Sequence, residues 1–192
     1  WDYIFPMLNA VEDWKQKIDL GTVKKIQDHG VQVRLKVLQL ICFVVHKTPR
    51  WFPGNKLFNM DFSIVDRKNR IKLKPAILCL LEENETRVKI NTLQVLCELA
   101  AFNPNVILSN LSIFQGRLRK IVLRSRREVK NMGNKSSDDY LMFYWACGAM
   151  KTISDIPGMD RNSSFQIEKS KCLKNQKGPF YNAIAMFKQF KF

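Results

Sequence analysis

The stretch Val33–Pro49, VRLKVLQLICFVVHKTP, recurs 55 residues later as Val88–Pro104, VKINTLQVLCELAAFNP. Five aligned positions are identical in the two copies: Val33/Val88, Leu38/Leu93, Gln39/Gln94, Cys42/Cys97 and Pro49/Pro104. A weaker third copy, Asp138–Ser154, places Cys147 at the position of Cys97. Similarity at a regular spacing is typical of a repeat architecture, in which each unit packs on its neighbours.

Each of the two strong copies has the pattern of a long helix that ends at a proline. In Val33–His46 the apolar residues recur every three or four positions, which is the spacing of one face of an α-helix. Because proline cannot continue a helix, Pro49 and Pro104 are expected to end the two long helices.

A shorter apolar segment precedes each long helix. These segments are Thr22–Gln27 and Pro75–Glu82, and a proline suits the first position of a helix, where no N–H is needed. The polar turns Asp28–Gly30 and Glu83–Glu85 follow them. Because such short connections join antiparallel neighbours, each copy predicts an antiparallel helix pair.

The residues GVQVRLKVLQLICFVV (30–45) and ETRVKINTLQVLCELA (85–100) resemble the start of the second repeat helix in the armadillo/HEAT superfamily. The resemblance covers residues 20–125 and, more loosely, 138–156. It implies an all-α fold, a right-handed α-solenoid of stacked antiparallel helix pairs, with a groove that binds extended peptides or partner domains. A plain helical bundle with an accidental repeat is the alternative.

The expected organisation is a helical-repeat domain over residues 1–156, with units at about 20–74, 75–130 and 131–156. The first unit exceeds the usual repeat length of about 40–47 residues, and the excess is expected to be a loop over Arg50–Lys72. Residues 157–192 are basic and rich in aromatic residues. We expect them to form a capping helix or tail, with a basic segment at a membrane surface as the alternative.

Positive charge concentrates in the C-terminal half. The 192 residues include 32 Lys and Arg against 17 Asp and Glu, and the net charge of +15 favours acidic partners. On a helix, Leu118, Ile121 and Val122 would form a buried face. The basic stripe lies beside them and consists of Arg117, Lys120, Arg124 and Arg127. It is either an anion-binding stripe or an ordinary solvated helix face.

The polar sides of the two long helices are candidate walls of the binding groove. The candidate residues are Arg34, Lys36, Gln39, Lys89, Asn91 and Gln94. Ser125 lies in the sequence Arg-Ser-Arg-Arg, which is a context for phosphorylation. A phosphate on this serine would cancel part of the charge of the basic stripe.

The sequence has few residues suited to catalysis or metal binding. His46 follows Cys42 by four positions, but two ligands do not make a metal site, so a helix face is expected. Nucleotide-binding, nucleophile-elbow and zinc-protease motifs are absent. We therefore predict a non-enzymatic protein without a cofactor or metal. Five cysteines with no CxxC pair favour a cytoplasmic or nuclear location.

These patterns predict a protein–protein interaction scaffold that binds an acidic or amphipathic segment of another protein through a basic groove or face. One alternative is a nucleic-acid-binding helical-repeat module, in which the basic stripe contacts phosphates and binding falls steeply with salt. A second alternative is a tubulin-binding HEAT module, suggested by Trp51 in a loop. A membrane partner is not expected, and the oligomeric state is left open.

Overall fold

Six α-helices and one small sheet make up most of the part of the chain that the structure describes. The computed structural model describes residues 1–8, 23–65, 70–131 and 137–159. The elements are, in chain order, the 3₁₀ turn η1 (Phe5–Leu8), α2 (Val23–Lys47), the 3₁₀ turn η2 (Pro49–Trp51), α3 (Gly54–Asn59), β1 (Asp61–Val65), β2 (Ile71–Pro75), α4 (Ala76–Glu82), α5 (Thr86–Phe102), α6 (Pro104–Asn131) and α7 (Ser137–Ser154). The fold is mostly helical, as expected, and the two-stranded sheet is an unpredicted addition.

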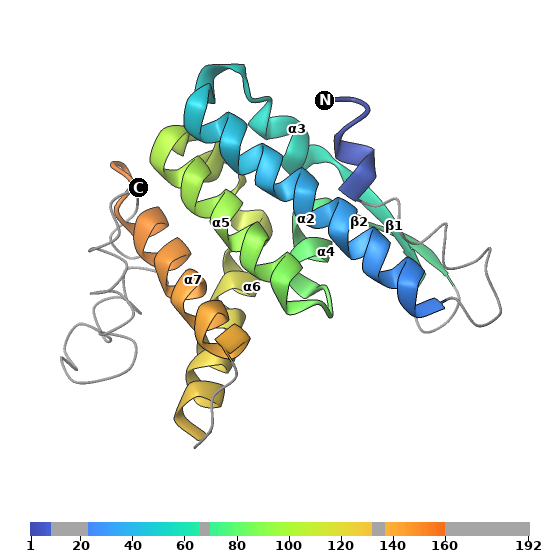
Figure 1. The fold of residues 1–192 in the computed structure, drawn as a ribbon. Helices are drawn as coiled ribbons and strands as arrows, with labels where there is room; N and C mark the ends of the chain where they lie inside the picture. The colour runs from blue at the N-terminus through green and yellow to red at the C-terminus, as the bar shows by residue number, and fades with distance from the viewer. Residues whose placement is uncertain (9–22, 66–69, 132–136, 160–192) are drawn as a thin grey trace.

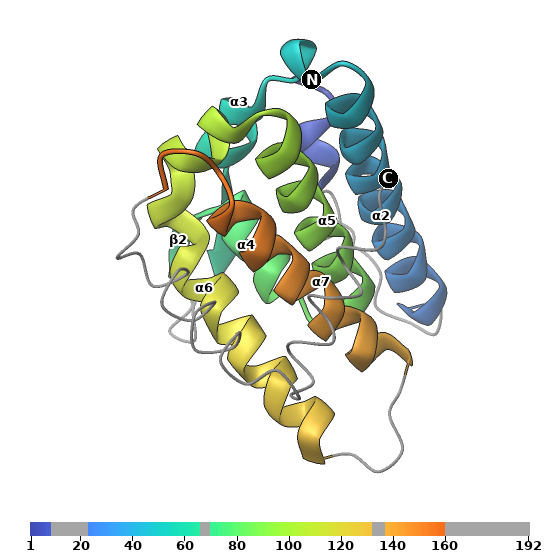
Figure 2. The ribbon, with the colours of Figure 1, turned by 90° about the vertical axis from the view of Figure 1, so that its left-hand side faces the viewer.

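The three helices that carry the repeated pattern lie side by side (Figure 1). Helix α5 packs against α2 on one side and against α7 on the other, and all three run in the same direction. Helix α6 runs in the opposite direction and packs on α5 and α7 (Figure 2), and α4 packs on α5 and α6. The three copies found in the sequence are therefore neighbouring parallel helices.

The core between these helices is almost wholly apolar. Side chains from every long helix and from α4 are buried there: Leu38, Ile41, Val45, Ile77, Leu80, Leu81, Leu93, Leu96, Leu99, Ile107, Phe114, Leu118, Phe143, Cys147 and Ile153. Burying one side chain of this size stabilises a fold by about 1.5–3 kcal/mol relative to leaving it exposed. The positions that the helical spacing marks as apolar therefore hold α2, α5, α6 and α7 together.

The second copy forms the antiparallel helix pair that the sequence predicts. Helix α4 ends at Glu82, and Glu83 leaves the helical region with φ −50° and ψ 147°. The side chain of Glu85 then caps α5 by accepting a hydrogen bond from the backbone N–H of Arg87. Helix α5 ends at Phe102, and Pro104 is the first residue of α6. Both the turn and the helix end at the proline are confirmed.

The first copy does not form a helix pair, and that prediction is wrong. Helix α2 runs without a break from Val23 to Lys47, through the expected turn at Asp28–Gly30. This segment contains no proline, and a glycine inside a helix costs only about 1 kcal/mol relative to alanine. Continuous backbone hydrogen bonding and the packing on α5 outweigh that cost. Helix α2 ends at Lys47, before Pro49, as expected.

The expected loop over Arg50–Lys72 is also wrong, because most of it has regular structure. After η2 it forms α3 and then the antiparallel pair β1–β2, in which Asp61 pairs with Pro75 and Val65 pairs with Ile71. Phe62 of β1 is buried, whereas Ile71 and Leu73 of β2 are 75% and 71% exposed, so the apolar side chains of β2 face solvent. Residues 66–69, between the strands, lie outside the described residues.

Two glycines make a matched test of the packing between α3 and α6. A Cβ on Gly54 would lie 2.8 Å from Cγ1 of the buried Val106, whereas a Cβ on Gly116 of α6 would meet no atom within 4 Å. We expect Gly54→Ala to lower the free energy of unfolding by about 1–3 kcal/mol. Gly116→Ala should raise it by about 0.5–1 kcal/mol, because alanine favours a helix interior. Urea denaturation measures both, and shifts of the same sign would contradict this packing.

Candidate anion-binding site

The basic stripe lies on α6, as predicted, beside a buried apolar face. Leu118, Ile121 and Val122 of this helix are buried against the rest of the molecule. The helical spacing of three and four residues therefore places the charged side chains correctly on the side of α6 that borders solvent.

The structure divides the stripe into two parts. Arg117 is half-buried, and its Nε lies 3.7 Å from Oε1 of Glu82 at the end of α4. Arg124 is mostly exposed and donates a hydrogen bond of 2.8 Å from Nε to Oε1 of Glu128, one turn further along α6. Lys120 and Arg127 are exposed on α6. Arg117 therefore borders the end of α4, whereas Lys120, Arg124 and Arg127 border solvent.

Lys89 of α5 joins the stripe from the neighbouring helix. Its side chain is half-buried. Burial lowers the pKa of this lysine, and repulsion by Arg124 and Arg117 lowers that pKa further, with Glu128 and Glu83 acting in the opposite direction. Lys89, a residue predicted for the groove, therefore lies within electrostatic range of Arg117 and Arg124, two residues predicted for the stripe.

The acidic residues around this cluster already have basic partners. Glu82 forms an ion pair with Lys74 of β2, and Glu83 forms one with Arg34 of α2. Glu128 pairs with Arg124. Within the described ranges, Lys89 has no ion pair, and the buried Nε of Arg117 has no hydrogen-bond acceptor. The cluster therefore has more donors and positive charge than its own glutamates satisfy.

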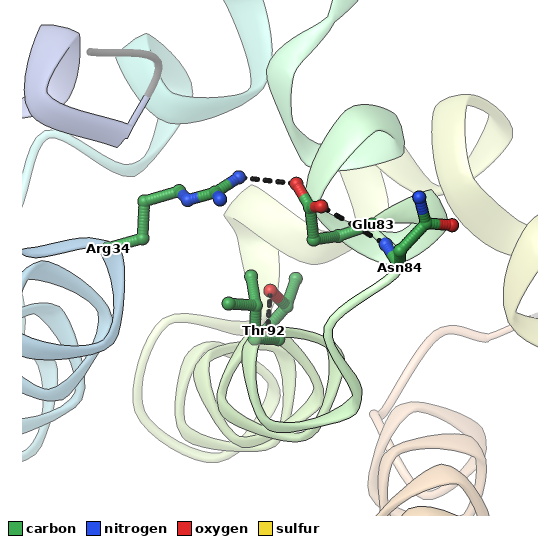
Figure 3. Close-up of polar contacts among 5 residues, drawn as sticks. Arg34, Glu83, Asn84 and Thr92 are labelled. Carbon is green, nitrogen blue, oxygen red and sulfur yellow. Dashed lines mark hydrogen bonds and ion pairs between the residues drawn. The ribbon is translucent and has the colours of Figure 1, made fainter. Parts of the chain in front are cut away.

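Arg34 has a structural role rather than a place in a groove. It is only 9% exposed, and its guanidinium pairs with Glu83 in the turn between α4 and α5 (Figure 3). The other oxygen of Glu83 accepts a hydrogen bond of 3.1 Å from the backbone N–H of Asn84. This carboxylate therefore links α2 to the start of α5.

The other groove candidates do not form one surface with the stripe. Lys36 and Gln39 are exposed on α2, which packs mainly on α5. Asn91 and Gln94 are half-buried on α5, and the side chain of Asn91 donates to the backbone carbonyl of Arg87. Of the six groove candidates, Lys89 is the one whose pKa is lowered by the charges of Arg124 and Arg117, after the larger effect of burial.

Ser125 is poorly placed for modification. It is 3% exposed and lies on the buried face of α6, so the folded chain does not present its hydroxyl to a kinase. The spacing from Leu118 and Val122 predicts this burial, because residues three and seven positions apart share a helix face. The helical period therefore predicts the burial of Ser125, which the local Arg-Ser-Arg-Arg sequence does not.

The Cys42 and His46 pair belongs to the packing between α2 and α5. Nδ1 of His46 lies 3.3 Å from Oε2 of Glu98, and its ring packs edge-on against Phe102. Burial raises the pKa of the Cys42 thiol to about 12 and raises that of Cys97 well above its usual range. The described residues contain no group of three or more potential metal ligands.

Two predicted features remain outside these contacts. Trp51, on which the tubulin alternative depends, is exposed in η2. The predicted capping tail at 157–192 lies outside the described residues from residue 160 onward.

In the described ranges no helix offers an apolar stretch long enough to traverse a lipid bilayer. Comparisons of this chain with protein-family models, with curated proteins and with solved structures found no match.

Proposed function

We propose that this chain is a non-enzymatic protein-interaction scaffold that binds an acidic segment of a partner protein. The binding surface is the basic surface, which we define as Lys89 of α5 together with Arg117, Lys120, Arg124 and Arg127 of α6. The observation that carries the proposal is the row of basic side chains on α6: Lys120, Arg124 and Arg127 are exposed, and Nε of Arg117 has no hydrogen-bond acceptor in the part of the chain that the structure describes. Carboxylates of a partner would supply the missing charge and acceptors.

The scaffold part of the proposal rests on the repeat. Three parallel neighbouring helices, α2, α5 and α7, carry equivalent apolar patterns, and α4 and α5 form an antiparallel pair. We propose that these are units of an armadillo/HEAT-type solenoid acting in the cytoplasm or nucleus. In such an array, each unit buries its apolar face against the next and leaves a long surface for a partner.

An acidic peptide is favoured over nucleic acid by the composition of the surface. Three glutamates, Glu82, Glu83 and Glu128, lie around the cluster and would repel a continuous phosphate backbone. Single-strand binding also relies on exposed aromatic side chains that stack on bases. In the described ranges, none of the large apolar side chains that are exposed belongs to α6.

A charge-reversal triple variant tests the proposed surface. We expect Arg117→Glu/Lys120→Glu/Arg124→Glu to weaken binding of a fluorescent glutamate-rich peptide by about tenfold or more at low salt, because attraction becomes repulsion. Fluorescence anisotropy measures the affinity, and circular dichroism checks that each variant is folded.

The matched control changes the net charge equally at a different surface. Lys36, Lys47 and Arg50 are exposed, and their reversal to glutamate should leave peptide binding nearly unchanged. Equal losses in the two triple variants would show that net charge alone attracts the peptide. Preferential binding to random duplex DNA, with a steep salt dependence, would favour the nucleic-acid alternative instead.

A further inference from the structure

The outward side of α2 carries apolar side chains that the fold leaves uncovered. Leu40 and Phe43 are 42% and 61% exposed. On the opposite side of the same helix, which packs on α5, three side chains are completely buried: Leu38, Ile41 and Val45. Residues three or four positions apart share a helix face. Leu40 and Phe43 therefore lie together on the side of α2 that α5 does not cover.

A lysine lies at each end of this apolar pair. Lys36 precedes Leu40 by one turn, Lys47 follows Phe43 by one turn, and both lysines are exposed. The spacing places these four residues in a single line along α2, which we call the outer row. From Gly30 to Lys47 the helix contains no Asp or Glu. The charge of the outer row is therefore wholly positive.

The apolar surface continues from the outer row toward the end of α5. His46 lies one turn after Phe43, and its ring packs edge-on against Phe102, which is 43% exposed. Glu98 is half-buried, and its Oε2 lies 3.3 Å from Nδ1 of His46, so this carboxylate already has a partner within the fold. Two neighbouring helices thus contribute to one surface that is partly apolar and positively charged.

We propose that the outer row of α2 binds an amphipathic helix of another protein. Apolar side chains of that helix cover Leu40 and Phe43, and its acidic side chains lie against Lys36 and Lys47. Burial of the apolar pair drives the association, and the two charge pairs fix the register of the bound helix. The outer row lies on a different helix from the basic surface, so this inference goes beyond the proposed function.

The charge of the outer row favours an acidic partner over a second copy of this chain. In a two-fold dimer the same patch contacts itself, so Lys36 and Lys47 of one copy would lie against the lysines of the other. A membrane is also disfavoured, because a helix that lies in a membrane surface has a broad apolar face and carries its basic residues on the polar face. In the outer row the lysines are in line with the apolar pair.

The test uses an alanine-based helical peptide whose two leucines and two flanking glutamates repeat the spacing of the outer row. Fluorescence anisotropy at physiological salt measures its affinity for the full chain. We expect Leu40→Ser/Phe43→Ser to weaken binding by about tenfold or more, because the apolar area that the peptide buries is lost. Ile71→Ser/Leu73→Ser, at two exposed apolar residues of β2, is the matched control and should leave the affinity unchanged. Circular dichroism checks that each variant is folded.

The charge pairs are tested with a second peptide that has lysines in place of the glutamates. It should bind the unchanged protein about tenfold more weakly than the glutamate peptide, and Lys36→Glu/Lys47→Glu should reverse this preference. The triple charge reversal of the basic surface on α6 should leave binding of the amphipathic peptide nearly unchanged. The glutamate-rich peptide has no apolar side chains and should be insensitive to Leu40→Ser/Phe43→Ser. Failure at one surface is therefore distinguishable from failure at the other.

Four outcomes would overturn the inference. These are equal affinity for the two amphipathic peptides, equal losses in the two serine variants, no binding of either peptide, and a different occupant. A dimer in sedimentation equilibrium that Leu40→Ser/Phe43→Ser dissociates would assign the outer row to a second copy. Co-sedimentation with phosphatidylserine vesicles that the same variant abolishes would assign it to a membrane.

Discussion

Phe114→Ala is expected to lower the free energy of unfolding by about 3–5 kcal/mol. The side chain of Phe114 is completely buried in α6, and its ring centroid lies 5.6 Å from that of Phe58 in α3. Removing the ring deletes the contact between α6 and α3 and leaves a cavity in the core. The neighbouring helices are rigid, so they fill this cavity only in part. The loss should also uncouple α3 from α6, since Phe58 loses its aromatic partner.

Urea denaturation followed by circular dichroism measures this effect. Phe43→Ala is the matched control, because Phe43 is 61% exposed on α2 and should change the free energy of unfolding by no more than about 0.5 kcal/mol. A loss below about 1 kcal/mol for Phe114→Ala would contradict its burial between α3 and α6.

Arg34→Met is expected to cost about 2–3 kcal/mol of stability, the second largest effect. Methionine keeps most of the apolar stem, so the loss comes mainly from the carboxylate of Glu83, which stays half-buried without its guanidinium. Breaking a fully buried ion pair from one side costs about 3–5 kcal/mol, and the solvent exposure of Glu83 reduces this value. The turn between α4 and α5 should loosen first, since this carboxylate connects it to α2 (Figure 3).

A double-mutant cycle with Glu83→Gln separates the ion pair from other effects. The two changes together should cost less than the sum of the single changes, because the double variant leaves neither charge alone. Lys36→Met, two positions away but exposed, provides the control for replacing a cation on α2. Strict additivity of Arg34→Met and Glu83→Gln would show that the two side chains do not interact in solution.

The predictions that succeeded depend on local rules. Helices α2 and α5 end before Pro49 and Pro104 because a proline disfavours the helical conformation in the residue that precedes it, and Thr48 and Asn103 are both non-helical. Leu118, Ile121 and Val122 are buried together because α6 is long and regular enough for the 3.6-residue period to hold. Rules of this kind need only the residues of one element.

The predictions that failed required a comparison of competing energies. At Asp28–Gly30 a weak turn signal opposed a continuous helix, and the backbone of α2 adopts the helix. At Glu83–Glu85 a similar polar turn persists, since Glu85 caps the next helix and Arg34 pairs with Glu83. The hairpin β1–β2 was hidden by the expectation that an insertion in a helical repeat is a loop.

The candidate site could be predicted only as separate parts. Sequence spacing places Arg117 and Arg124 on one face of α6, and Lys89 on a polar side of α5. Their convergence depends on how α5 and α6 pack, which involves residues far apart in the chain. Glu82 and Glu83 lie at the end of α4 and pair with Lys74 and Arg34. The residue pattern of one helix does not predict these ion pairs.

The repeated cysteines have a kinetic consequence. Alkylating reagents react with the thiolate, and the raised pKa values of Cys42 and Cys97 leave almost none of it at neutral pH while α2 remains packed on α5. Labelling of the native protein therefore proceeds through transient opening of that contact. When closing is faster than alkylation, the rate measures the opening equilibrium; when reagent is abundant, it measures the opening rate itself. The thiols of Cys42 and Cys97 therefore report the separation of α2 from α5.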